Sequence, residues 1–84
     1  MDFKCLIVLY VPEIDEHYEF YIPVNKHVDD VIKILNRAIN EISYGVYPIK
    51  EGLSLVNRRT GEVYDKGFYV RNTTIKNGCQ LVLY

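Results

Sequence analysis

The sequence has few cysteines, no tryptophan and no long hydrophobic run. Its two cysteines, Cys5 and Cys79, are too few for the disulfide framework of a small secreted domain, and they predict a cytoplasmic location. No stretch reaches the roughly 18 apolar residues that a membrane-spanning segment needs, so we expect no direct membrane insertion. The first residues, Met1 to Lys4, also lack the basic region that opens a signal peptide.

The sequence also lacks an excess of charge of either sign. Its formal net charge is −1, whereas nucleic-acid-binding proteins usually carry a clear basic excess. Arg58 and Arg59, with Lys50 and Arg71, could bind phosphate, and Tyr64 and Tyr69 are candidates for stacking on bases. The balanced charge argues against this interpretation, so we expect no nucleic-acid partner.

Motifs for catalysis and metal binding are missing as well. His17 and His27 have no cysteine at the spacing of a metal site, and we interpret both as solvated edge residues. Asp29 and Asp30 point about 100° apart on a helix and cannot share a proton as a catalytic pair does. Without a Gly-rich phosphate loop or a nucleophile elbow, we expect no enzymatic activity and no cofactor.

The order of predicted elements indicates an α+β fold in one domain, residues 1–84. Strands are predicted for 3–11 and 18–24, which are joined by turn residues and form a hairpin. Apolar residues then recur at spacings of three and four over 28–43, which predicts an amphipathic helix with one buried stripe. The residues of this stripe are Val28, Val31, Ile32, Leu35, Ile39 and Ile42.

The second half of the chain predicts three further strands. The first covers 53–57, and a turn with Gly61 at a positive φ leads to a short return strand at Val63 and Tyr64. A loop over 66–77 follows, with Val70 and Ile75 as inward anchors, and the last strand covers 81–84. A mixed β-β-α-β-β-β sheet with one helix on one face is the arrangement of the β-grasp fold.

In the order of its predicted elements, the chain resembles ubiquitin-like proteins over nearly its whole length. The residues that carry the resemblance are Gly61, Tyr64, Asp65, Thr74, Ile75, Asn77, Gly78 and Leu81-Val82-Leu83. Within that superfamily it is most similar to the small bacterial YukD/EsaB group, which is associated with type VII secretion. The resemblance implies a cytoplasmic adaptor or regulator. We expect no conjugation or carrier activity, because no Gly-Gly pair follows the last strand.

A surplus of apolar side chains in the sheet predicts where a partner docks. If Leu81 and Leu83 face the helix, the alternation of strand residues leaves a second apolar face on the outside. We predict a protein-binding site there, formed by Leu6, Val8, Tyr10, Val56, Val82 and Tyr84. The resemblance agrees, since partners of ubiquitin-like folds commonly dock on this face. The alternatives are a homodimer that pairs through the same face, or a loop that covers it.

Overall fold

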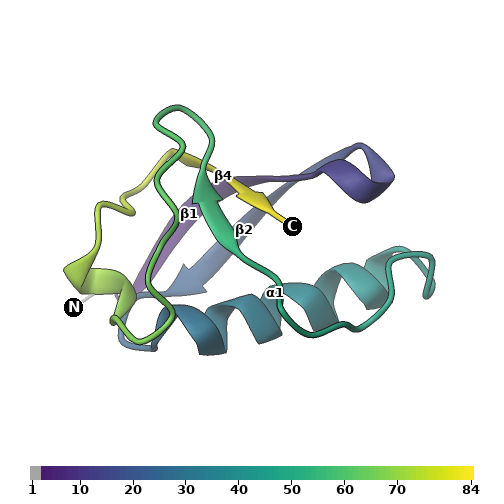
Figure 1. The fold of residues 1–84 in the computed structure, drawn as a ribbon, viewed down its shortest axis with the longest axis horizontal. Helices are drawn as coiled ribbons and strands as arrows, with labels where there is room; N and C mark the ends of the chain where they lie inside the picture. Colours follow the sequence, from purple (N-terminus) through teal and green to yellow (C-terminus); the bar gives the residue numbers. More distant parts are fainter. Residues whose placement is uncertain (1–2) are drawn as a thin grey trace.

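The computed structural model describes residues 3–84, which form one four-stranded sheet and one α-helix (Figure 1). Two single turns of 3-10 helix, η1 and η2, lie in the connections. In chain order the elements are β1 (Lys4–Val11), η1 (Pro12–Ile14), β2 (Glu16–Pro23), α1 (Val28–Ile42), β3 (Leu55–Asn57), η2 (Val70–Asn72) and β4 (Cys79–Leu83).

The strands lie in the order β2-β1-β4-β3. β1 is antiparallel to β2 and parallel to β4, while β3 is antiparallel to β4. α1 supplies the crossover from β2 to β3, which run in the same direction at opposite edges of the sheet, because parallel strands cannot be joined by a tight turn. The predicted α+β arrangement, a mixed sheet with one helix on one face, is confirmed.

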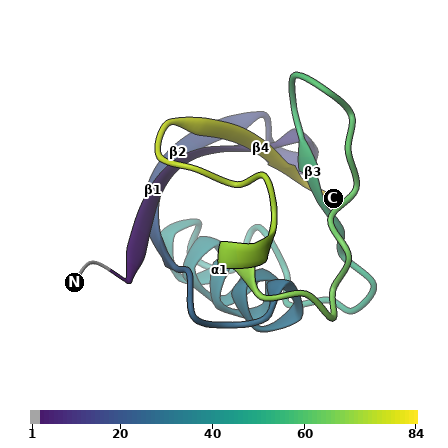
Figure 2. The same ribbon diagram turned by 90° about the vertical axis from the view of Figure 1, so that its left-hand side faces the viewer.

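The hydrophobic core lies between α1 and the concave face of the sheet. Figure 2 shows the sheet curving over the helix, with the connection before β4 closing one end. Leu35 and Ile39 of α1 are buried together with Leu9 of β1 and Leu81 and Leu83 of β4. Each such side chain contributes about 1.5–3 kcal/mol when it leaves water. The prediction that Leu81 and Leu83 face the helix is therefore confirmed.

The apolar stripe of α1 differs from the prediction at one residue. Ile42 is half exposed, whereas Asn36, which the hydrophobic pattern left out, is buried. The Asn36 amide group donates to the Pro48 carbonyl oxygen at 3.0 Å and accepts from the Lys50 N–H at 2.9 Å. The chain after α1 runs back along the helix, so a polar side chain is needed there to pair the backbone of this connection.

The predicted return strand at Val63 and Tyr64 is reduced to a single bridge between Val56 and Val63. The Tyr64 side chain turns inward instead and is buried. Its hydroxyl group lies 2.9 Å from Oγ1 of Thr74 and 3.0 Å from Nδ2 of Asn57. The other predictions for this half of the chain hold, because Gly61 has a φ of 78° and both Val70 and Ile75 are buried.

The start of α1 is completed by backbone groups rather than by a capping side chain, whereas at its end the Ser43 hydroxyl group also donates to the Asn40 carbonyl oxygen at 3.3 Å. At its start the N–H groups of Val28 and Asp29 donate to the carbonyl oxygens of Phe68 and Lys66. At its end Tyr44 and Gly45 both have a positive φ, 54° and 83°, and the Gly45 N–H donates to the Asn40 carbonyl oxygen. Left-handed residues commonly end helices in this way, although glycine or asparagine is usual there.

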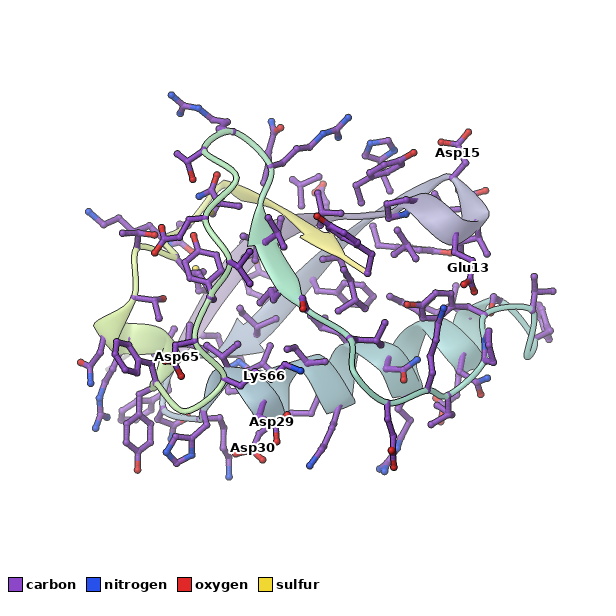
Figure 3. The ribbon with its side chains drawn as sticks, in the orientation of Figure 1. Glu13, Asp15, Asp29, Asp30, Asp65 and Lys66 are labelled. Carbon is purple, nitrogen blue, oxygen red and sulfur yellow. The ribbon has the colours of Figure 1, made fainter. Side chains whose placement is uncertain are left out.

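The acidic residues of the first half of the chain do not form one surface. Figure 3 places Glu13 and Asp15 at the hairpin turn, away from Asp29 and Asp30 below the helix. Asp29 and Asp30 occupy the first turn of α1, where the helix dipole favours negative charge. Within residues 3–84, no helix is long and apolar enough to cross a membrane.

Candidate functional site

The outer sheet face, which we define as the face opposite α1, carries the predicted binding residues. Side chains alternate along β1, so that Leu6, Val8 and Tyr10 lie between buried residues that point to the core. All three are partly exposed, as is Val82 of β4. Tyr84, directly after β4, is 62% exposed.

The strand register brings three of the predicted residues into one row. Tyr10 of β1 pairs with Val82 of β4, and Val82 pairs in turn with Val56 of β3. Val56 belongs to this row but is only 6% exposed, so it supports Val82 from the side and offers almost no contact area itself. Leu6 and Val8 lie further along β1 on the same face. The predicted residues thus share one face of the sheet, on which the exposed polar residues Glu19 and Gln80 lie directly beside Val8.

Two exposed apolar side chains extend this surface beyond the prediction. Val63 lies opposite Val56 and is 63% exposed, while Tyr21 pairs with Leu6 and is 69% exposed. Partners that lie directly opposite each other in an antiparallel pair project from the same face. Both residues lie in segments that the sequence predicted to be strands, 18–24 and the return strand at Val63 and Tyr64.

A polar and aromatic group, which we call the Tyr10 cluster, lies at one end of the outer sheet face. It consists of Tyr10, Asp15, His17 and Arg58. The Tyr10 hydroxyl group donates to a carboxylate oxygen of Asp15 at 2.9 Å, and the rings of Tyr10 and His17 stack with their centroids 4.6 Å apart. The hydrogen bond to Asp15, together with partial desolvation, raises the pKa of Tyr10 above its usual value, although Arg58 acts in the opposite direction.

Arg58 crosses the sheet to reach this cluster. Its backbone N–H donates to the Gln80 carbonyl oxygen of β4 at 2.9 Å. Its guanidinium carbon lies 4.8 Å from the centre of the Tyr10 ring, and Nη1 lies 2.8 Å from Nε2 of His17. His17 is exposed, as expected for an edge residue, but it also helps to hold Arg58 over β1 and β2.

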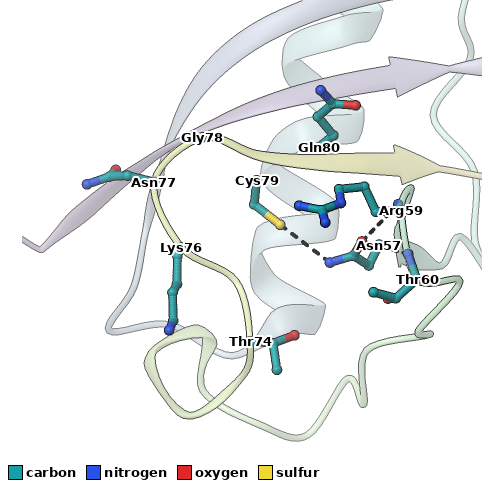
Figure 4. A pocket seen from close by; sticks show the side chains of 9 residues that line it. All are labelled: Asn57, Arg59, Thr60, Thr74, Lys76, Asn77, Gly78, Cys79 and Gln80. Atoms are coloured by element: carbon teal, nitrogen blue, oxygen red, sulfur yellow. Dashed lines mark hydrogen bonds between the residues drawn. The ribbon is translucent and has the colours of Figure 1, made fainter.

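An open depression of about 400 Å³ lies at the start of β4 (Figure 4). Arg59 and Lys76 lie on different walls of it, and Gln80 connects it to the sheet. On its floor an amide N–H of Asn57 lies 3.6 Å from the Cys79 sulfur. Asn57 and Cys79 share the alternation of the core residues Leu55 and Leu81, so this floor lies on the side of the sheet that faces α1.

The structure does not assemble the phosphate site that the four basic residues suggested. Lys50 forms an ion pair with Glu13, and the guanidinium group of Arg71 stacks on Tyr69. Tyr64 is buried and presents no surface for stacking on a base. Among residues 3–84 no group of three or more His, Cys, Asp or Glu side chains could hold a metal ion.

Comparison with known proteins identifies the fold. No protein-family model matches the chain, and no curated protein does. Among solved structures, one described as molecular mimicry of SUMO that promotes DNA repair is 23% identical, with a TM-score of 0.75 over 100% of this chain and 94% of that chain. The EccD5 ubiquitin-like domain from Mycobacterium xenopi is 12% identical, with a TM-score of 0.67 over 96% and 92%.

A third solved structure places this fold within a larger assembly. A chain of the MycP5-free ESX-5 inner membrane complex is 12% identical, with a TM-score of 0.69 over 99% of this chain and 21% of that chain. In that case the fold is one part of a much longer membrane-complex component. At these identities the similarity shows the fold and not the function. The chain has the ubiquitin-like β-grasp fold.

Proposed function

We propose that this protein is a ubiquitin-like protein-binding module without catalytic or conjugating activity, and that it acts as a cytoplasmic adaptor or regulator of a type VII secretion system. The observation that supports this most is the outer sheet face, where Leu6, Val8, Tyr10 and Val82 are partly exposed on the side opposite α1. An apolar surface on the free side of a sheet is typical of a protein-binding site. The secretion pathway is supported by the fold shared with EccD5 and with a component of the ESX-5 inner membrane complex.

Affinity capture from native cell lysate tests this proposal with three forms of the protein. The first is the natural chain, and the second carries Val82→Asp at the centre of the outer sheet face. The third carries Ile34→Asp, which makes the same kind of change on the exposed side of α1, where Ile34 is 47% exposed. Amide NMR spectra first establish that each variant is folded.

We expect secretion-system proteins to be captured by the natural chain and by Ile34→Asp, and to be lost with Val82→Asp. A charge in the centre of an apolar contact must be desolvated without a partner, which weakens binding strongly. Equal capture by all three forms would contradict docking at the outer sheet face. Sedimentation over a range of concentrations tests the alternative that two copies pair through this face. In that case the measured mass should rise with concentration.

A further inference from the structure

The turn that leads into β4 contains Asn77-Gly78, the one asparagine–glycine pair in the sequence. Such a pair loses the asparagine side-chain amide readily, because glycine has no Cβ atom to hinder attack by its backbone nitrogen. In this reaction the Gly78 nitrogen bonds to Cγ of Asn77, and Nδ2 leaves as ammonia with the proton of the attacking nitrogen. Water then opens the cyclic imide at either carbonyl carbon, which leaves aspartate or isoaspartate at position 77.

The folded turn holds the two reacting groups apart. The Cys79 N–H donates to the Lys76 carbonyl oxygen at 3.0 Å, and Gly78 has a φ of 83° while the φ of Asn77 is not positive. This combination is a type II turn, in which the ψ of the residue at the Asn77 position is about +120°. Closure of the imide ring needs the Gly78 nitrogen on the side-chain side of this bond, roughly 120° away from its place in the turn. The reaction therefore requires the turn to open.

Leu6 of β1 holds this turn in place. Its N–H donates to Oδ1 of Asn77 at 2.8 Å, and its carbonyl oxygen accepts from the Gly78 N–H at 2.8 Å. The Asn77 side chain thus supplies the acceptor that a backbone carbonyl supplies in a parallel ladder. The leaving group is not restrained in this way, because Nδ2 has no hydrogen-bond partner within residues 3–84 and the side chain points away from the depression (Figure 4). Rotation at Asn77 therefore has to break the contact with Leu6.

We propose that Asn77-Gly78 is a deamidation site that reacts when the start of β4 separates from β1. The aspartate product can restore the contact, because its carboxylate still accepts from the Leu6 N–H. The isoaspartate product cannot, because it adds one carbon atom to the main chain between this contact and β4. Since β1 and β4 are the two central strands of the sheet, a transient opening is converted into a permanent loss of stability.

Mass spectrometry of the natural chain tests where and when the reaction occurs. The protein is incubated at one pH and temperature, in native buffer and in urea concentrations that extend beyond its unfolding transition. Fragmentation of the intact chain assigns the mass gain of deamidation to a residue. Asn25 and Asn72 are the internal controls, because both are exposed but are followed by lysine and threonine.

We expect Asn77 to react at least about tenfold more slowly in native buffer than in urea beyond the transition, because only the opened fraction reacts. In urea it should react before Asn25 and Asn72. Equal rates at Asn77 in the two conditions would overturn control by the fold. A rate in urea no higher than those of the two controls would overturn the site itself.

The separated products test the consequence for the sheet. The aspartate and isoaspartate forms are compared with Asn77→Asp, which reproduces the first of them. We expect Asn77→Asp to keep the slow hydrogen exchange of the Leu6 N–H and the urea midpoint of the natural chain. The isoaspartate form should exchange faster at Leu6 and unfold at a lower urea concentration. An isoaspartate form that matches the natural chain in both measurements would overturn the lasting effect on β1 and β4.

Discussion

The guanidinium carbon of Arg58 lies 4.8 Å from the centre of the Tyr10 ring, although Arg58 follows a strand that does not pair with the strand of Tyr10. Arg58 comes directly after β3 at one edge of the sheet, and Tyr10 lies on β1, beyond β4. The contact therefore exists only when three strands are assembled in the correct register. The environment of the Tyr10 ring therefore depends on whether β1, β4 and β3 are correctly paired.

Alkaline pH should destabilise the protein. The pKa values of Tyr10, Tyr47 and Lys50 are all raised in the folded state, by the hydrogen bond to Asp15, by burial and by the hydrogen bond to Glu13, respectively. A group with a raised pKa contributes stability that is fully present below its unfolded pKa and is lost as the pH rises through the folded value. Urea unfolding should therefore show falling stability above a pH of about 10.

The matched control for this pH dependence is the double variant Tyr10→Phe and Tyr47→Phe. It lacks two of the three titrating groups, so its stability should fall less steeply between a pH of about 9 and 11. Tyrosinate absorbance should also show fewer tyrosine side chains that lose their proton above the usual pKa of tyrosine. Stability that rises with pH in this window would contradict the raised pKa values of Tyr10, Tyr47 and Lys50 in the folded state.

Removing the Tyr47 hydroxyl group should not destabilise the protein. Tyr47 is buried, and its hydroxyl group has no hydrogen-bond partner within residues 3–84. A buried polar group without a partner keeps its desolvation cost, so Tyr47→Phe should leave the free energy of unfolding unchanged or raise it by up to about 1 kcal/mol. Tyr47→Ala, which removes the ring as well, should lower it by about 3–5 kcal/mol. Urea unfolding measures both, and a clear loss for Tyr47→Phe would indicate a bound water at this position.

Asn36→Ala should destabilise the connection between α1 and β3. The amide group of Asn36 pairs with the backbone at Pro48 and at Lys50, so its removal takes a hydrogen bond from both. We expect a loss of about 1–3 kcal/mol in the free energy of unfolding and faster amide exchange at Lys50. Arg37→Ala, on the exposed side of the same helix turn, should change stability by less than about 0.5 kcal/mol. Slow exchange at Lys50 in Asn36→Ala would refute the role of the buried amide.

Tyr44→Asn should stabilise the end of α1. Tyr44 has a φ of 54° and is 97% exposed, so its side chain gains almost nothing from packing while its backbone is in the left-handed region. That region costs a residue with an ordinary side chain roughly 1–2 kcal/mol, and asparagine tolerates it better. We expect the free energy of unfolding to rise by about 0.5–1 kcal/mol. Tyr44→Ala is the control and should show no comparable gain, because alanine lacks the amide group with which asparagine hydrogen-bonds the local backbone.

Local patterns predicted most of the fold but not the contacts across it. The spacing of Val28 to Ile39 predicted α1, and the alternation of β1 predicted the outer sheet face with Leu6, Val8 and Tyr10. Ile42 was assigned to the wrong environment and the burial of Asn36 was not predicted, because the path of the connection after α1 decides which residues are covered. Arg58 and His17 are 41 positions apart, so no sequence pattern could indicate their contact.

The pairing of β1 with β4 has a consequence for the synthesis of the protein. The side chain of Asn77 accepts a hydrogen bond from the Leu6 N–H, 71 positions earlier in the sequence, and β1 and β4 are the two central strands of the sheet. At translation rates of roughly 5–20 residues per second, β1 waits on the order of 4–14 s outside the ribosome before β4 emerges. During that interval the apolar side of β1 has only β2 and α1 to cover it. A chaperone at the ribosome exit would therefore first meet this part of the chain as a hairpin and a helix, before the sheet closes.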